Sequence, residues 1–194
     1  MSLPTSDTPT TEGDAPTGSD DRAAALRRGL IDAGIVLAWF LVVGTLGAVA
    51  WWQLVDLPEA TRSGSSIVLE PDQLGKAVNI DAWFFAIALV GGLVSGVALL
   101  NWRHRDPLLM VLLVTLGGGV ASVLMAKFGQ WLGPSPQTEV LRHKPNGAHA
   151  PVLLELTGSG SGFSHATGVL WVWPAAAALG ALVYLWVLKD PTSD

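Results

Sequence analysis

Four long runs of apolar residues divide the chain, and the polar segments between them differ greatly in length. Each run approaches the about 20 residues that cross about 30 Å of hydrocarbon as an α-helix. No run carries a charge in its interior; Asp32 lies in the first turns of the first run, where a carboxylate favours the positive end of the helix dipole. We therefore predict an all-α membrane protein, a four-transmembrane-helix bundle over residues 29–52, 82–102, 108–126 and 168–188.

The first run has an alternative interpretation as a cleaved signal peptide, because Ala48, Val49 and Ala50 resemble a small-residue cleavage site. Signal peptides have an apolar region of about 7 to 15 residues that follows a basic N-terminus closely. Here the run is longer and its basic flank lies far from the first residue. An uncleaved first span is therefore favoured.

The polar segments complete the predicted organisation. Pro, Ser, Thr, Gly and Asp dominate the first 21 residues, and such a segment cannot offset its ordering entropy by burial. We expect a disordered acidic cytoplasmic head with a short basic flank (1–28), extracytoplasmic loops (53–81 and 127–167), a cytoplasmic turn (103–107) and a cytoplasmic tail (189–194).

The distribution of basic residues predicts the orientation. Arginines next to span ends gather on one side of the four-span arrangement, and the positive-inside rule assigns that side to the cytoplasm. We predict a multi-pass protein of the plasma membrane with both termini cytoplasmic. The loops on the other side hold basic residues at lower density. An anionic-lipid site in "NWRHRDP" (101–107) is a less favoured interpretation, because such sites usually hold about 4 to 8 basic residues. The predicted topology anchors are Arg27, Arg28, Arg103 and Arg105.

Tryptophans mark the predicted membrane boundaries, because indoles prefer the headgroup level. Trp102 and Trp186 fall at inner ends of spans, and Trp39 is the one tryptophan predicted at depth. The predicted interfacial residues at the outer ends are Trp51, Trp52, Trp83, Trp131, Trp171 and Trp173.

Small residues recur at helical spacing and predict close helix packing. Lipid supplies no hydrophobic drive for helices to associate, so close backbone approach has to hold them together. The favoured interpretation is packing within one bundle; a homodimer through the face of Gly92 and Gly96 is the alternative. The predicted helix-packing residues are Gly92, Gly96, Gly117, Gly118 and Ala121.

The second outer loop is far longer than a connection needs, and long loops are usually functional or disordered. Its segments 138–144 and 151–157 have strand character and flank a turn-rich stretch, and 65–70 in the first loop has a similar pattern. We predict a small extracytoplasmic cap of two or three short β-strands.

Composition supports a membrane protein and excludes several activities. Half of the 194 residues are hydrophobic and 14% are charged, against about a quarter in soluble domains. The chain has no cysteine, which excludes thiolate chemistry and disulfides. The net charge is −5 and the basic residues are scattered, so nucleic-acid binding has no electrostatic support.

Candidate chemistry in the polar segments is sparse. His143, His149 and His165 have no compact ligand spacing, and we predict no metal, cofactor or catalytic residues. Asp81 is interpreted as the N-cap of the second span, with a cation site as the alternative. Asp81 and Lys127 form a candidate polar site, although an interfacial lysine that snorkels to water explains Lys127 without a partner.

The interior of the spans argues against a coupled transporter that works as a single chain. Carriers place ionisable residues or broken helices at mid-depth. Side-chain polarity there is limited to Thr45, Ser95, Thr115 and Ser122, which leaves a pore built by an oligomer open.

Several stretches resemble a family of uncharacterised actinobacterial four-span membrane proteins. They include "NIDAWFFAIALVGGLVSG", "NWRHRDP", "KFGQWLGP" and "VLWVWPAAAALG", and they extend from about Asp32 to Leu188. The shared features are an Asp-aromatic start to the second span (Asp81, Trp83, Phe84) and a Val172-Trp173-Pro174 entry to the fourth. The resemblance implies a Gram-positive plasma membrane and transfers no activity or catalytic residue.

These patterns favour a non-enzymatic scaffold or accessory subunit whose outer loops engage a partner in the cell envelope. The partners expected are membrane lipids, an envelope protein and, under the alternative for the glycine face, a second copy of the chain. One alternative is a small oligomeric transporter or channel. Another is a membrane-bound enzyme that acts on lipid or envelope precursors, with Asp81, Glu155 and His165 as nominal candidates.

Overall fold

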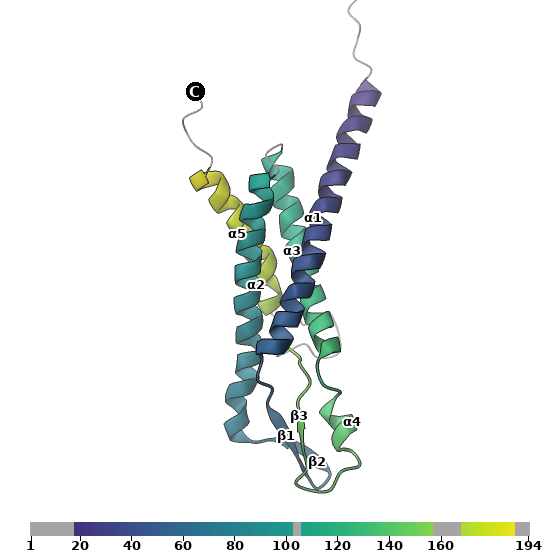
Figure 1. The fold of residues 1–194 in the computed structure, drawn as a ribbon, viewed down its shortest axis with the longest axis vertical. Coiled ribbons are helices and arrows are strands. Elements are labelled where there is room, and N and C mark those ends of the chain that lie inside the picture. The colour runs from purple at the N-terminus through teal and green to yellow at the C-terminus, as the bar shows by residue number, and fades with distance from the viewer. Residues whose placement is uncertain (1–17, 103–105, 157–167, 189–194) are drawn as a thin grey trace, which may run out of the picture.

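Four long helices form a bundle with a small β-sheet at one end (Figure 1). The computed structural model describes residues 18–102, 106–156 and 168–188. The helices are α1 (Gly18–Leu54), α2 (Leu74–Trp102), α3 (Pro107–Leu132) and α5 (Val172–Val183), the last preceded by η3 (Gly168–Trp171) and followed by the π-helix η4 (Tyr184–Leu188). Helices α1, α2 and α3 are each long and apolar enough to cross a membrane, and α5 reaches that length together with η3 and η4, over Gly168–Val187. The predicted fold class is confirmed, and the chain is a multi-pass membrane protein.

In the core of the bundle, large buried side chains pack against small residues of neighbouring helices. α5 packs mainly against α2 and α3, and α1 packs mainly against α3. Phe40, Trp51, Phe84 and Trp173 are fully buried and fill the centre. Many leucines and valines are exposed, for example Leu116 at 61%, and so much apolar surface is stable only when lipid covers it.

The helix ends differ from the predicted bounds. Residues 18–21 were expected to be disordered and 22–28 to form a short basic flank, yet 18–28 form the first three turns of α1, which project beyond the bundle (Figure 1). Their alanines, leucine and arginines are strong helix formers, and Arg28 Nε donates to Ala24 O at 3.0 Å. Helix α3 continues to Leu132 rather than Ala126, because the charge of Lys127 points outward and does not interrupt the helix.

Helix α2 begins at Leu74 rather than Ala82, so the N-cap role predicted for Asp81 is wrong. Asp81 lies inside the helix, about two turns after its start. Helix α3 does have a capped start: Asp106 Oδ1 accepts a hydrogen bond from Leu109 N at 3.3 Å, and Pro107 occupies the first turn, where its missing N–H costs nothing.

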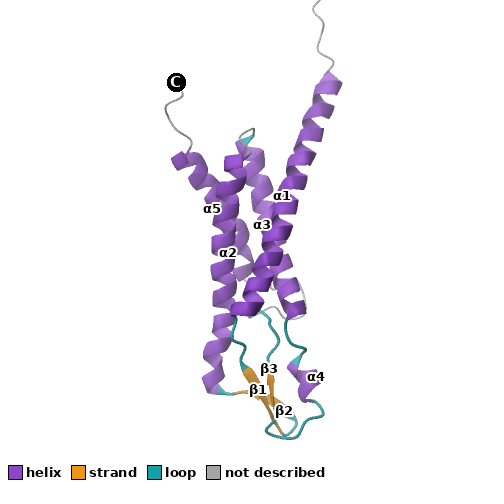
Figure 2. Cartoon of the chain, viewed as in Figure 1, coloured by secondary structure: helices purple, strands orange, loops and turns teal. Residues whose placement is uncertain are grey.

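A three-stranded antiparallel sheet of order β2-β1-β3 lies at the end of the bundle opposite the C-terminal end of α2 (Figure 2). Its strands are β1 (Glu59–Ser63), β2 (Ser66–Leu69) and β3 (His149–Pro151). Strands β1 and β2 form a tight hairpin in which Ser63 pairs with Ser66 and Gly64 has φ +64°, a conformation that suits glycine. Strand β1 also pairs with β3, with Ala60 opposite Ala150.

The strand predictions are partly correct. The strand expected over 65–70 is β2. The segment 138–144 was predicted as a strand but begins as the short helix α4 (Gln137–Leu141) and continues as a turn. In 151–157, Pro151 alone belongs to a strand among the described residues, and 152–156 run without a strand partner. Strand β1 was not predicted.

The cap, defined here as residues 55–73 and 133–156, is attached to the bundle by buried side chains. Leu154 and Leu156 are 1% and 2% exposed and belong to the core of the bundle. Val152 N donates to Pro58 O at 2.9 Å, and Leu153 N donates to the side chain of Gln137 at 3.1 Å. Leu154 and Leu156 therefore join the cap to the core of the bundle, while Ala60, Leu141 and Ala150 form a separate small cluster within the cap.

Candidate functional site

Arg62 organises the distal part of the cap. Its Nη1 donates to the carbonyl oxygens of Leu141 and Arg142, both at 2.9 Å, and to that of Lys144. Its Nε donates to Gly64 O at 3.2 Å. The last carbonyls of a helix have no partner within the helix, so this guanidinium satisfies the C-terminal end of α4 and fixes it to the hairpin.

The main chain around Arg62 reinforces this attachment. Arg62 N donates to Ala148 O at 3.0 Å, and Gly147 N donates to Arg62 O at 2.9 Å. Gly147 has φ +83°, a left-handed conformation that L side chains rarely adopt. The turn 142–148 is thus held by hydrogen bonds to Arg62, and its conformation depends on that residue.

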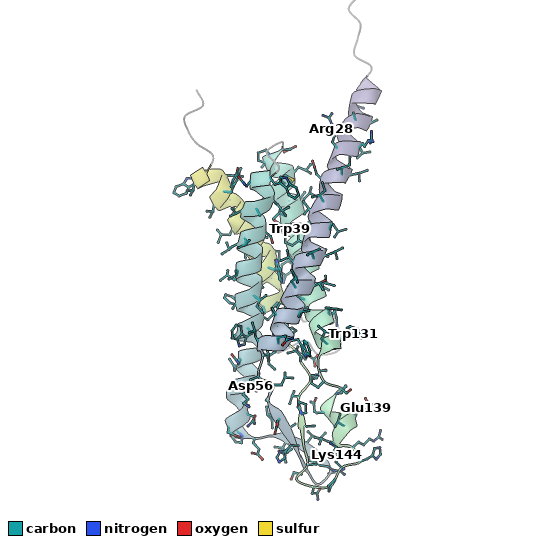
Figure 3. All side chains as sticks on the ribbon, viewed as in Figure 1. Arg28, Trp39, Asp56, Trp131, Glu139 and Lys144 are labelled. Carbon is teal, nitrogen blue, oxygen red and sulfur yellow. The ribbon has the colours of Figure 1, made fainter. Side chains whose placement is uncertain are left out.

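An open groove of about 870 Å³ lies between the hairpin and α4. We call it the cap groove. Arg62, Ser65, Ser66 and Ile67 line it from the hairpin, and Thr138, Glu139, Leu141, Arg142 and His143 line it from the α4 side. Figure 3 places Glu139 and Lys144 at this distal end of the cap, far from the bundle.

The chemistry of the cap groove suits binding. Arg142, His143 and Glu139 are exposed, and Ser65 and Ser66 add hydroxyls. These groups offer hydrogen-bond donors and acceptors of both charges around the apolar Ile67 and Leu141. A mixed polar rim around apolar side chains is typical of a surface that recognises another molecule.

A second polar cluster lies across the sheet. Thr61 Oγ1 is 2.9 Å from His149 Nδ1 and 3.4 Å from Glu70 Oε1. The three residues are neighbours on paired strands or just beyond a strand end, and cross-strand hydrogen bonds of this kind stabilise sheets. Within 18–102, 106–156 and 168–188, no three or more His, Asp or Glu residues gather as they would around a metal ion. His165 lies outside those ranges.

The candidate polar site of Asp81 and Lys127 is divided between two helices. Asp81 is half-buried in α2, and Lys127 is exposed on α3. Nearby, Lys76 forms an ion pair with Asp56 at 3.2 Å, largely in solvent. A polar site at Asp81 and Lys127 stays a prediction.

The glycine positions pack inside the chain. A Cβ on Gly92 would lie 2.7 Å from Ala176 Cβ, and one on Gly96 would lie 2.2 Å from Ala177 O, so α5 occupies this face of α2. On α3, Gly117 faces Phe40 of α1, and Gly118 faces Pro174 of α5. Gly44 approaches Ala121 in the same way. A homodimer would have to use another surface.

The interfacial role predicted for two tryptophans is wrong. Trp51 and Trp173 are 0% exposed and lie within the bundle, whereas headgroup contact requires an exposed ring. Trp51 Nε1 donates to Ile80 O at 3.0 Å. Trp173 Nε1 has no hydrogen-bond partner in the described part of the chain. Exposed or partly exposed rings remain at Trp52, Trp83, Trp131 and Trp171.

Two of the predicted basic anchors, Arg27 and Arg28, lie at the end opposite the cap. Arg27 and Arg28 are exposed on α1, and Figure 3 shows Arg28 on the projecting part of that helix. Arg103 and Arg105 lie outside the described residues.

Two polar contacts inside the bundle escaped the sequence analysis. Trp39 Nε1 donates to Ser95 Oγ at 3.1 Å, and Ser122 Oγ donates to Leu170 O at 2.8 Å. Trp39 was the tryptophan predicted at depth, and Ser95 is one of few polar residues there. The sequence therefore contained a clue that these two side chains form a hydrogen bond. No comparable indication pointed to Arg62, because the carbonyl groups that it binds in the second outer loop lie about 80 residues away.

Comparison with protein-family models, with curated proteins and with solved structures finds no match to this chain. The resemblance to an actinobacterial membrane family stays a prediction, and what the site supports rests on its geometry.

Proposed function

We propose that the chain is a non-enzymatic scaffold or accessory subunit of a cell membrane, whose cap groove binds a protein partner. The single observation that supports this is the cap groove itself, which is polar, open and held in shape by Arg62. Its volume of about 870 Å³ accommodates a few side chains of a partner.

The attachment of the cap supports a scaffold role. A partner that binds the cap groove is held at a fixed position over the bundle, because Leu154 and Leu156 join the cap to the bundle core. We propose further that this membrane is the plasma membrane, that both termini are cytoplasmic and that the cap is extracytoplasmic. The exposed Arg27 and Arg28 at the opposite end support that orientation.

The packing of the bundle gives no support to a transporter that acts as one chain. Ser95 and Ser122 are the buried polar side chains among the described residues, and both have hydrogen-bond partners inside the bundle. Around them the core consists of apolar side chains. A conducting path would need a second copy of the chain.

Site-specific photo-crosslinking in intact cells tests the proposal. A photoreactive amino acid at Thr138 lies in the cap groove, and one at the exposed Asp72 lies on the cap but outside it. We expect a discrete protein adduct from position 138 that is absent from position 72. Equal labelling at both positions, or no protein adduct at 138, would contradict a partner in the cap groove.

A further inference from the structure

An apolar groove opens between α1 and α2, at the end of the bundle nearer the cap. We call it the span groove. Its volume is about 440 Å³, and its lining is almost entirely apolar. Helix α1 contributes Val43, Leu46, Gly47 and Ala50; helix α2 contributes Trp83, Ala86, Ile87, Val90 and Gly91; and Trp173 of α5 forms the floor.

Glycines on both walls hold the floor of the span groove in place. A Cβ on Gly47 would lie 3.0 Å from Trp173 Cη2, and a Cβ on Gly91 would lie 3.0 Å from Trp173 Cζ2. Both glycines therefore let the indole edge fit between α1 and α2. Because neither glycine has a side chain, the Trp173 ring fills the space between them and is 0% exposed below the span groove.

The span groove faces the surroundings of the bundle. Leu46 and Val90 on its rims are 64% and 61% exposed. The helices that bear them cross the membrane, so the groove opens to hydrocarbon rather than water. Helices α1 and α2 also pack against each other much less than α2 packs against α5. The space between α1 and α2 is therefore only partly filled by the protein.

The dimensions favour a slender occupant over a helix. From Trp83 to Gly91 the groove runs about 12 Å along α2, at 1.5 Å per residue. A helix about 10 Å wide fills roughly 420 Å³ per turn, so the whole volume of the groove would hold about one turn. A polymethylene chain is narrow enough to lie along its full length.

We propose that the span groove binds one acyl chain of a membrane lipid from the leaflet on the cap side. The chain lies along the exposed Leu46, Ala86 and Val90, above the buried Trp173, and the half-buried Trp83 marks the end nearer the headgroup. The energy comes from dispersion contacts and from filling a space that is otherwise poorly packed. The site is independent of the cap groove and of the partner proposed for it.

Photoactivatable lipid tests this site. The full chain is reconstituted into phosphatidylglycerol vesicles that contain a trace of the same lipid with a mid-chain diazirine, and crosslinked residues are mapped by mass spectrometry. We expect labelling at the span-groove residues to exceed that at the exposed Leu116 of α3 by about fivefold or more. Even labelling of all lipid-facing residues would overturn the proposal.

Two filling variants and a matched control complete the test. Ala86→Phe on α2 and Ala50→Phe on α1 place a ring in the span groove, whereas Ala175→Phe adds the same ring at an exposed position of α5 outside it. Labelling should fall at least fivefold in both filling variants and stay unchanged in the control. Unchanged labelling in a filling variant that keeps its helical circular dichroism overturns the proposal. So does crosslinking between two copies through a cysteine at Val90, because a second chain would then cover the groove.

Discussion

The Trp51 indole joins α1 to α2: its Nε1 donates to Ile80 O at 3.0 Å, and its ring meets Phe84 edge-on at 5.2 Å between centroids. Helix α3 approaches the same ring at Gly129, where a Cβ would lie 2.5 Å from Trp51 Cε3. One side chain thus connects three spans where the bundle meets the cap.

Trp51→Phe removes the hydrogen-bond donor but keeps an aromatic ring. Because phenyl is smaller than indole, the variant loses the hydrogen bond and some packing, and the free energy of unfolding should fall by about 1 to 3 kcal/mol. Trp51→Ala also removes the ring and should cost about 3 to 5 kcal/mol. Denaturation by SDS in mixed micelles measures both. Equal losses in the two variants would show that the ring contributes nothing beyond the donor.

Neighbouring glycines on α3 should respond oppositely to alanine. A Cβ on Gly118 would lie 2.9 Å from Pro174 Cα, so Gly118→Ala should push α5 away and cost roughly 1 to 3 kcal/mol. Gly119 has nothing within 4 Å, and Gly119→Ala should be neutral or stabilise the helix by up to about 1 kcal/mol. The same SDS titration compares them, and a loss in Gly119→Ala equal to that in Gly118→Ala would contradict the packing argument.

The Trp39–Ser95 hydrogen bond is suited to a double-mutant cycle. Ser95→Ala leaves the Trp39 Nε1 donor without its acceptor, whereas Trp39→Phe removes the donor itself. Bonds of this kind within membranes couple by about 0.6 kcal/mol on average. The double variant should therefore lose less stability than the sum of the single variants. Strict additivity in the unfolding free energies would show that the bond contributes nothing.

Arg62 should be irreplaceable by lysine. Its Nη1 and Nε reach four carbonyl oxygens on two sides, and a single ammonium cannot reproduce that fork. Arg62→Lys should speed amide hydrogen exchange in residues 137–151, measured by mass spectrometry. Lys76→Ala is the control, because it removes only a solvent-exposed ion pair worth about 0 to 1 kcal/mol. Unchanged hydrogen exchange in Arg62→Lys would show that the β-sheet alone maintains the conformation of the cap.

The absence of native cysteine makes the proposed orientation directly measurable. Single cysteines at Arg22 of α1 and Ser65 of the cap occupy exposed positions at opposite ends of the molecule. A membrane-impermeant maleimide should label Ser65→Cys in intact cells and Arg22→Cys only after permeabilisation. The reverse pattern would place the cap in the cytoplasm.

The bundle was predictable because lipid imposes a simple requirement on each span: enough apolar residues in one helix. The ends of the helices were not, since a helix continues wherever its backbone can bond internally. Residues 18–21 were predicted to be disordered and 74–81 to lie in a loop, because both are polar, yet both segments are helical. The alternation of residues in 138–144 resembles that of a strand. In the structure Leu141 is instead buried as the last residue of the short helix α4, whose C-terminal carbonyls accept hydrogen bonds from Arg62.

The candidate sites depend on contacts between distant segments, which one sequence read in order does not contain. Gly47, Gly91 and Trp173 lie on three helices, and only their assembly creates the span groove. The small-residue pattern identified Gly92 and Gly96 as packing positions, but it could not choose between α5 and a second copy. The cap groove could not be predicted without β1, and β1 was missed because its residues show little hydrophobic alternation.

The small size of the cap's own cluster has a practical consequence. Its buried members are Ala60, Leu141 and Ala150, and two of these are alanines, so the burial they provide is slight. A fragment of residues 55–73 and 133–156 without the helices would lose the hydrophobic core of the bundle, against which Leu154 and Leu156 pack. Immunisation, ligand screening and crystallography aimed at this tip therefore call for the intact protein in detergent or nanodiscs rather than a water-soluble fragment.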